Sequence, residues 1–139
     1  MKKYIISAVL LLLLCSSAWS QRWGIEGYFF RIGGGYASRG CVELRYKSGG
    51  TWKVWGRTCV SPNGYFIFND LDQRYMYYLY GYGADCGSEY GTNGPIPLLG
   101  SPHILRRDIH AESYTAKPGW CLNGCCLETF SPPEENDNE

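Results

Sequence analysis

Apolar and polar residues alternate along several short stretches of the chain, with the two-residue period of β-strands. The clearest case is 41–47, where Val42, Leu44 and Tyr46 share one face and charged residues share the other. Such a period indicates a strand with one buried face. Two glycines then predict a tight turn, and 51–59 is predicted to be the returning strand of a hairpin.

Other strands are indicated by aromatic and β-branched residues between turn signals. Strands are predicted at 25–32, at 65–68 after a Pro-Asn-Gly turn, at 75–82 and at 103–111. No helical period follows the first twenty residues. This pattern predicts an all-β fold, a small antiparallel β-sandwich of the prealbumin or immunoglobulin-like kind.

One segment between the predicted strands lacks a periodic pattern. Residues 81–100 are rich in Gly, Pro, Ser and Asn, and we expect a long loop that extends to Pro102 and is tied down by Cys86. Loops of this length are uncommon inside compact domains and are often functional.

The N-terminal residues 1–20 have the features of a secretory signal peptide. Two lysines precede an apolar run at 5–14 that is too short to span a bilayer, and small residues favour cleavage before Gln21. The alternatives are an uncleaved anchor helix and a lipid anchor at Cys15.

Cleavage leaves a nearly neutral chain. The formal charge falls from zero to −2 because Lys2 and Lys3 are removed. We expect a β-sandwich domain at 21–113, a cysteine-rich appendix at 114–130 and an acidic, disordered tail at 131–139. The charge predicts no binding to nucleic acid, and contact with a membrane is expected only through the signal peptide during export. The predicted location is secreted or periplasmic.

The exported chain keeps an even number of cysteines, which predicts disulfide bonds. They are Cys41, Cys59, Cys86, Cys121, Cys125 and Cys126. If the hairpin closes around its two glycines, Cys41 lies opposite Cys59, a spacing that suits a disulfide. The other four are expected to form two bridges, with Cys125 and Cys126 bonded separately and one bridge joining the appendix to Cys86. No Cys-x-x-Cys pair is present, so no metal site is predicted.

Residues 25–111 resemble the transthyretin-like and carboxypeptidase-regulatory-like (Cna protein B-type) β-sandwich modules. The shared pattern is Gly-x-Val-x-Leu at 40–44, Asn-Gly-Tyr-Phe-Ile-Phe at 63–68, then Leu71 and Tyr75. The cysteines and the Gly/Pro segment depart from it. The resemblance implies a structural, adhesive or binding domain rather than an enzyme, and it transfers no functional residue.

No side chain has the sequence context of an activated nucleophile. His103 and His110 lie seven positions apart, so in one strand they point to opposite faces and would not form a metal pair. Asp70 is expected to cap a turn. We therefore predict no catalytic residue, no metal, no cofactor and no enzymatic activity.

The excess of aromatic residues is the one functional signal. Tyr78, Tyr80 and Tyr82 share a strand face, while Trp52 and Trp55 can reach opposite faces of their strand. Flat rings bind sugars and proteins well. We predict a non-catalytic binding or adhesion module that recognises protein or carbohydrate through these residues and the long loop. The alternatives are a small secreted hydrolase or enzyme inhibitor that uses the same loop, and rings that only fill the core or cover its flanks.

Overall fold

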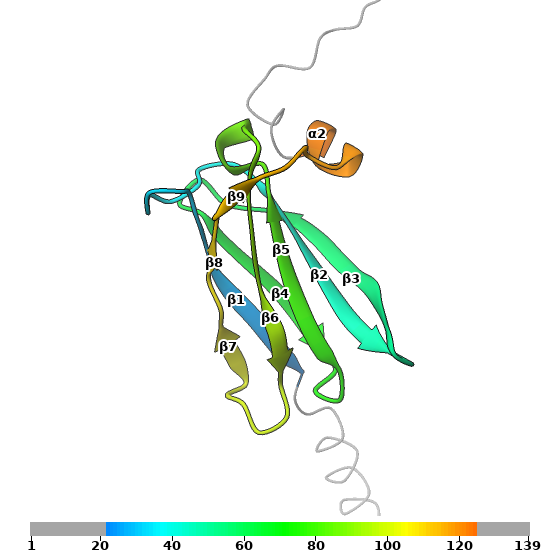
Figure 1. The fold of residues 1–139 in the computed structure, drawn as a ribbon. Helices are drawn as coiled ribbons and strands as arrows, with labels where there is room; N and C mark the ends of the chain where they lie inside the picture. The colour runs from blue at the N-terminus through cyan, green and yellow to red at the C-terminus, as the bar shows by residue number, and fades with distance from the viewer. Residues whose placement is uncertain (1–21, 125–139) are drawn as a thin grey trace, which may run out of the picture.

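The computed structural model describes residues 22–124, which form two facing β-sheets (Figure 1). The predicted signal peptide at 1–20 and the predicted tail at 131–139 lie outside this range. The strands are β1 (Trp23–Phe30), β2 (Cys41–Ser48), β3 (Thr51–Cys59), β4 (Tyr65–Leu71), β5 (Met76–Tyr82), β6 (Glu89–Pro97), β7 (Ile104–Arg106), β8 (Ile109–His110) and β9 (Ser113–Tyr114). The helices are the 3₁₀-helix η1 (Ala84–Cys86) and α2 (Gly119–Gly124).

The larger sheet has the strand order β3-β2-β5-β6-β9, and the smaller sheet has the order β4-β1-β7, with β8 also paired to β1. The described pairings are antiparallel except that β7 and β8 run parallel to β1. Figure 1 shows β5 and β6 of the larger sheet in front of β1 and β4. The prediction of a small, disulfide-stabilised β-sandwich is confirmed.

The core lies between the two sheets and is built mainly from alternate residues of β1, β2, β4 and β5. The larger sheet contributes Val42 and Leu44 from β2 and Tyr77 and Leu79 from β5; the smaller sheet contributes Ile25, Phe29, Phe66 and Phe68. The two-residue period of the sequence therefore assigned the inner face of β2 correctly. For β5 it placed Tyr78, Tyr80 and Tyr82 on one face, and the structure shows that this face points away from the core. Burial of these apolar side chains is the main favourable term in folding.

The prediction of a long loop at 81–102 is wrong, because β6 occupies the middle of this segment and pairs along β5. The glycines of β6 interrupt its alternating pattern in the sequence, and in the structure they permit close contacts with neighbouring groups. A Cβ atom on Gly91 would lie 2.3 Å from the carbonyl oxygen of His110, and one on Gly94 would lie 2.7 Å from ring atoms of Tyr78. Glycine inside a strand often marks such a close approach.

The predicted pairing of Cys41 with Cys59 is also wrong, although the two residues do lie opposite each other in the β2–β3 register. Cys41 is bonded instead to Cys121 of α2, with 5.8 Å between their Cα atoms. Helix α2 packs over this end of the sheet, and this brings Cys121 within bonding distance of Cys41. Cys59 is disulfide-bonded as well. Two bridges were predicted among Cys86, Cys121, Cys125 and Cys126. This prediction is wrong, because Cys121 is bonded to Cys41.

The appendix contacts the segment around Cys86 through a different interaction. The Lys117 Nζ donates a hydrogen bond of 3.0 Å to the Cys86 carbonyl oxygen. The remaining predicted disulfide partners, Cys125 and Cys126, lie outside the described residues.

We expect Gly91→Ala to lower the free energy of unfolding by about 1–3 kcal/mol or more, because the new methyl group would force β6 away from β8. Urea unfolding followed by fluorescence measures this change. Gly35→Ala is the matched control, because a Cβ there has no neighbour within 4 Å and should leave the stability equal or slightly higher. Equal stability of the two variants would contradict the close contact.

Candidate ligand-binding face

The side chains of the larger sheet that point away from the core form an aromatic and basic surface, which we call the outer face. Its aromatic members are Trp52, Tyr78, Tyr80, Tyr82, Tyr90 and Trp120. Its charged members are Glu43, Arg45, Lys47 and Arg57. In β5 the buried residues Tyr77 and Leu79 alternate with the tyrosines of this face, so one strand supplies both core and surface.

The aromatic members form a continuous row. The ring centroids of Tyr78 and Tyr80 are 5.1 Å apart, and those of Tyr80 and Tyr82 are 6.5 Å apart with planes only 10° from parallel. Trp52 extends the row on β3 by meeting Tyr78 edge-on at 5.5 Å, and Tyr90 extends it on β6 by meeting Tyr82 at 5.2 Å. The three β5 tyrosines are half-buried, so each ring also faces solvent.

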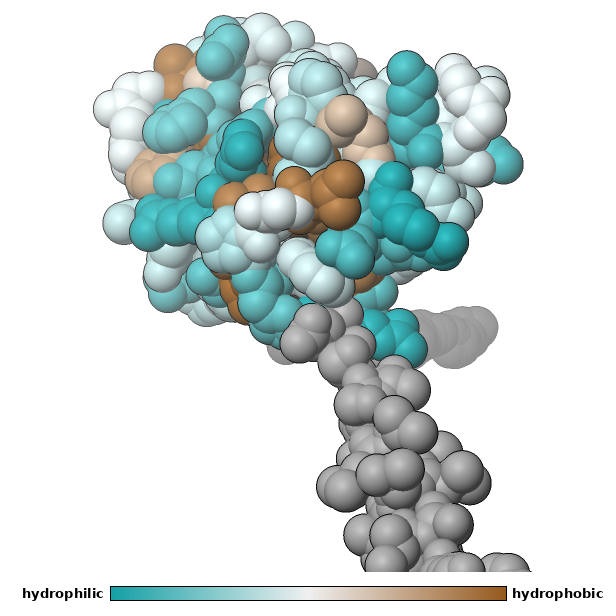
Figure 2. Space-filling view, turned by 90° about the horizontal axis from the view of Figure 1, so that it is seen from below, coloured by the Kyte–Doolittle hydropathy of each residue, from teal (hydrophilic) through white to brown (hydrophobic). Residues whose placement is uncertain are grey.

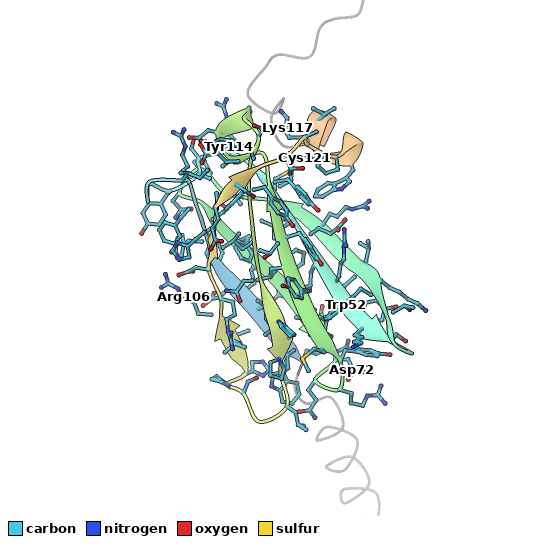
Figure 3. The ribbon with its side chains drawn as sticks, viewed as in Figure 1. Trp52, Asp72, Arg106, Tyr114, Lys117 and Cys121 are labelled. Atoms are coloured by element: carbon cyan, nitrogen blue, oxygen red, sulfur yellow. A yellow bond between two sulfur atoms is a disulfide. The ribbon has the colours of Figure 1, made fainter. Side chains whose placement is uncertain are left out.

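Helix α2 adds a ring at the upper end of the row. Trp120 meets Tyr82 edge-on at 6.0 Å, and the Cys41–Cys121 bond holds the helix on β2. In Figure 3, Cys121 and Trp52 mark the upper end and a lower part of this face. The cysteine-rich appendix, predicted to follow the domain, is therefore part of the candidate site.

A charged cluster lies in the middle of the outer face. Glu43 is only 1% exposed, and its two carboxylate oxygens accept hydrogen bonds from Arg45 Nε at 2.6 Å and Arg57 Nε at 2.9 Å. The Arg45 guanidinium lies over the Tyr80 ring at 4.1 Å, and that of Arg57 lies over the Trp120 ring at 4.8 Å. Cation–π contacts of this kind fix the orientation of each guanidinium.

Burial raises the pKa of the Tyr82 and Tyr90 phenols above their usual value. For Tyr82 this effect outweighs the opposing influence of the Arg45 charge. Both hydroxyls therefore stay protonated near neutral pH and can donate hydrogen bonds. The outer face thus combines neutral phenols and indoles with fixed cations, a chemistry suited to binding.

Trp55, the fifth predicted binding residue, does not join the outer face. Its ring contacts Tyr46, Tyr75 and Tyr77 at centroid distances of 5.4, 6.5 and 5.8 Å, on the opposite side of β3 from Trp52. The two tryptophans therefore point to opposite faces, as predicted.

Trp55 instead lines a separate cleft of about 340 Å³ at the lower end of the sandwich, where Figure 3 labels Asp72. The lining residues are Arg22, Trp23, Trp55, Asp70, Leu71, Asp72 and Gln73. Figure 2, which views this end, shows hydrophobic residues at the surface among polar ones.

Six of the ten members of the outer face were not predicted as binding residues, namely Tyr90, Trp120, Glu43, Arg45, Lys47 and Arg57. Tyr90 was hidden by the wrong loop prediction, and Trp120 by its place in the appendix. Arg57 is separated from Trp52 by an odd number of positions, yet both face outward because a bulge at Trp55 shifts the β2–β3 register. The alternation in 41–47 did place Arg45 on the polar side of its strand, and this signal could have been linked to the tyrosines.

Comparison with protein-family models, with curated proteins and with solved structures found no match to this chain. The resemblance to transthyretin-like modules therefore stays a prediction. Within residues 22–124, no helix is long and apolar enough to cross a membrane. The described part of the chain also holds no group of three or more His, Cys, Asp or Glu residues placed to bind a metal.

At the cleft, Asp72 is held by Arg74, whose Nη2 and backbone N–H donate hydrogen bonds of 2.6 and 2.9 Å to its carboxylate. These bonds lower the pKa of Asp72 to about 2. A carboxyl group whose pKa falls on folding stabilises the fold above its unfolded pKa of about 3.9, and this contribution is lost as the pH falls through 2.

We therefore expect Asp72→Asn to lower the melting temperature at neutral pH, with a difference from wild type that vanishes near pH 2. The effect should be small because Arg74 is 78% exposed and solvent screens the pair. Thermal melts across the acid range test this. Arg74→Gln should give a similar pH-dependent loss, and the double variant should lose no more than the larger single loss; fully additive losses would contradict the pairing.

Proposed function

We propose that this protein is an exported, non-catalytic binding module that holds its ligand on the outer face. The observation that carries the proposal is the continuous row of half-exposed rings, contributed by β3, β5, β6 and α2, around two arginines that lie on rings of the same row. Protein or carbohydrate ligands both suit such a row.

The rings of the outer face are prepared for binding by their contacts with one another. Tyrosine and tryptophan offer a large contact area with only two rotatable side-chain angles. Packing in a row restricts these angles before the ligand arrives, which reduces the entropy that binding costs. The competing interpretation is that the rings only shield the sheet.

Export is supported by two observations. The Cys41–Cys121 bond is buried, with both residues 0% exposed, and a buried disulfide is compatible with an oxidising compartment. The sequence of 1–20 has the pattern of a signal peptide. We propose a secreted or periplasmic location on these grounds.

The alternative function, a hydrolase or enzyme inhibitor acting through a loop at 81–102, has less support. Most of the segment forms the end of β5, η1 and β6, and the longest stretch without a strand or helix is 98–102 at its end. It contributes Tyr90 to the outer face, so it belongs to the proposed binding surface.

Replacing two central rings tests the proposal. We expect Tyr78→Ala combined with Tyr80→Ala to reduce ligand affinity about tenfold or more, because a few central aromatic residues dominate most interfaces. A glycan array and a pull-down with the mature protein identify the ligand, and calorimetry then measures the affinity of each variant. Circular dichroism confirms that the variant is folded.

Tyr114→Ala is the matched control for this experiment. Tyr114 is 68% exposed on β9, and its side chain lies outside the row. Its loss should leave the affinity unchanged. Undiminished binding by the folded Tyr78/Tyr80 double variant would overturn the proposed role of the outer face.

A further inference from the structure

The charges at the centre of the outer face do not balance. One buried carboxylate, that of Glu43, is paired with two guanidinium groups, those of Arg45 and Arg57. The arginine side chains are 33% and 44% exposed, whereas that of Glu43 is 2% exposed. A surplus positive charge therefore faces solvent, while its counter-charge lies beneath it.

Both arginines also have donors to spare. Each uses its Nε to bond Glu43, and among residues 22–124 neither terminal nitrogen of either guanidinium has a hydrogen-bond partner. A guanidinium presents five N–H donors in a fixed fork that matches the two oxygens of an acid group. The two forks are fixed from below by Glu43 and against Tyr80 and Trp120 by stacking.

The surroundings of the pair limit the shape of the ligand. Tyr78 and Trp52 continue the row on one side, and Trp120 covers the other. Lys47, with its Nζ 5.9 Å from the centre of the Trp52 ring, adds a further cation along the row. A ligand that covers this surface must offer flat, C–H-rich faces to the rings and acid groups to the cations.

We propose that Arg45 and Arg57 form an anion site for an acidic glycan, whose carboxylate or sulfate lies on the two guanidiniums while its sugar rings lie against Tyr80 and the neighbouring aromatic residues. Each unit of such a glycan combines a flat face with an acid group. An acidic peptide carries its carboxylates on flexible stems and offers no comparable face to the rings. This inference rests on the proposed function and names its ligand class.

The test measures the affinity of the mature protein for four probes by calorimetry. The probes are an oligogalacturonate, a heparin oligosaccharide, a neutral maltohexaose and poly-L-glutamate. We expect binding of one or both acidic glycans that weakens as salt is raised, because the contact is between charges. The oligogalacturonate and heparin arms distinguish carboxylate from sulfate.

Arg45→Gln and Arg57→Gln should each reduce acidic-glycan affinity about tenfold or more, the effect of losing charge-assisted hydrogen bonds. Arg106→Gln is the matched control: Arg106 also pairs with a carboxylate, that of Asp108, and lies 4.9 Å from the centre of the Tyr28 ring, but it belongs to β7 of the other sheet (Figure 3). It should leave affinity unchanged. If a single variant fails to fold, the triple variant Glu43→Gln, Arg45→Gln, Arg57→Gln removes all three charges together and leaves no unpaired one.

The outcomes separate this inference from the proposed function. Affinity that falls on Arg45→Gln and Arg57→Gln but not on Arg106→Gln supports the anion site. The anion site would be overturned if the protein bound maltohexaose or poly-L-glutamate most tightly. It would also be overturned if all arginine variants had the same affinity for the acidic glycans. Either result would count against the anion site even if the Tyr78/Tyr80 variant still lost its ligand. Binding that survives loss of both the tyrosines and the arginines would reject the outer face altogether.

Discussion

The outer face depends on one constraint, the cost of taking the Glu43 carboxylate out of water. A buried carboxylate is tolerated only when it is paired and hydrogen-bonded. Two arginines from neighbouring strands meet this need, and each contributes only its Nε. The same requirement that satisfies Glu43 therefore fixes the direction of Arg45 and Arg57, and it leaves their remaining donors toward solvent.

The aromatic rings complete this arrangement from the sides. Tyr80 lies against Arg45, and Trp120 lies against Arg57. Because Tyr80 belongs to β5 and Trp120 to α2, the cluster connects the centre of the sheet to the C-terminal helix. Rigid elements that hold both charges and rings favour a preorganised surface, for which little ordering is needed on binding.

Much of the fold could be predicted from the sequence because the two-residue period is a direct record of which side chains face the core. The alternation along β5 separated Tyr77 and Leu79 from Tyr78, Tyr80 and Tyr82, but both groups are apolar or aromatic, so the sequence did not show which of them faces the core. Strand β6 was not predicted, because Gly91 and Gly94 interrupt its alternating pattern. Glycine is required at Gly91 by the close approach of the His110 backbone and at Gly94 by that of the Tyr78 ring. Contacts of this kind depend on the assembled fold and leave no local periodicity.

The candidate site was only partly predictable for related reasons. The shared face of the three β5 tyrosines and the opposite directions of Trp52 and Trp55 followed from strand alternation, whereas the contact of Trp52 with Tyr78 did not. Arg57 did not, because the bulge at Trp55 changes which face the following residues of β3 occupy. The hairpin register that put Cys41 opposite Cys59 was right, but register alone could not show that α2 would bring Cys121 closer to bonding geometry.

The complete outer face also requires the Cys41–Cys121 bond, and therefore a compartment in which this bond stays oxidised. Helix α2 is short, and a helix of this length has little stability of its own in water. The disulfide holds it against β2, and through it Trp120 reaches Tyr82 and Arg57. In a reducing compartment the helix would lose this tether, and Arg57 would lose the ring that orients it. The complete face therefore belongs to the oxidised protein, which links the chemistry of the site to the compartment in which the disulfide forms.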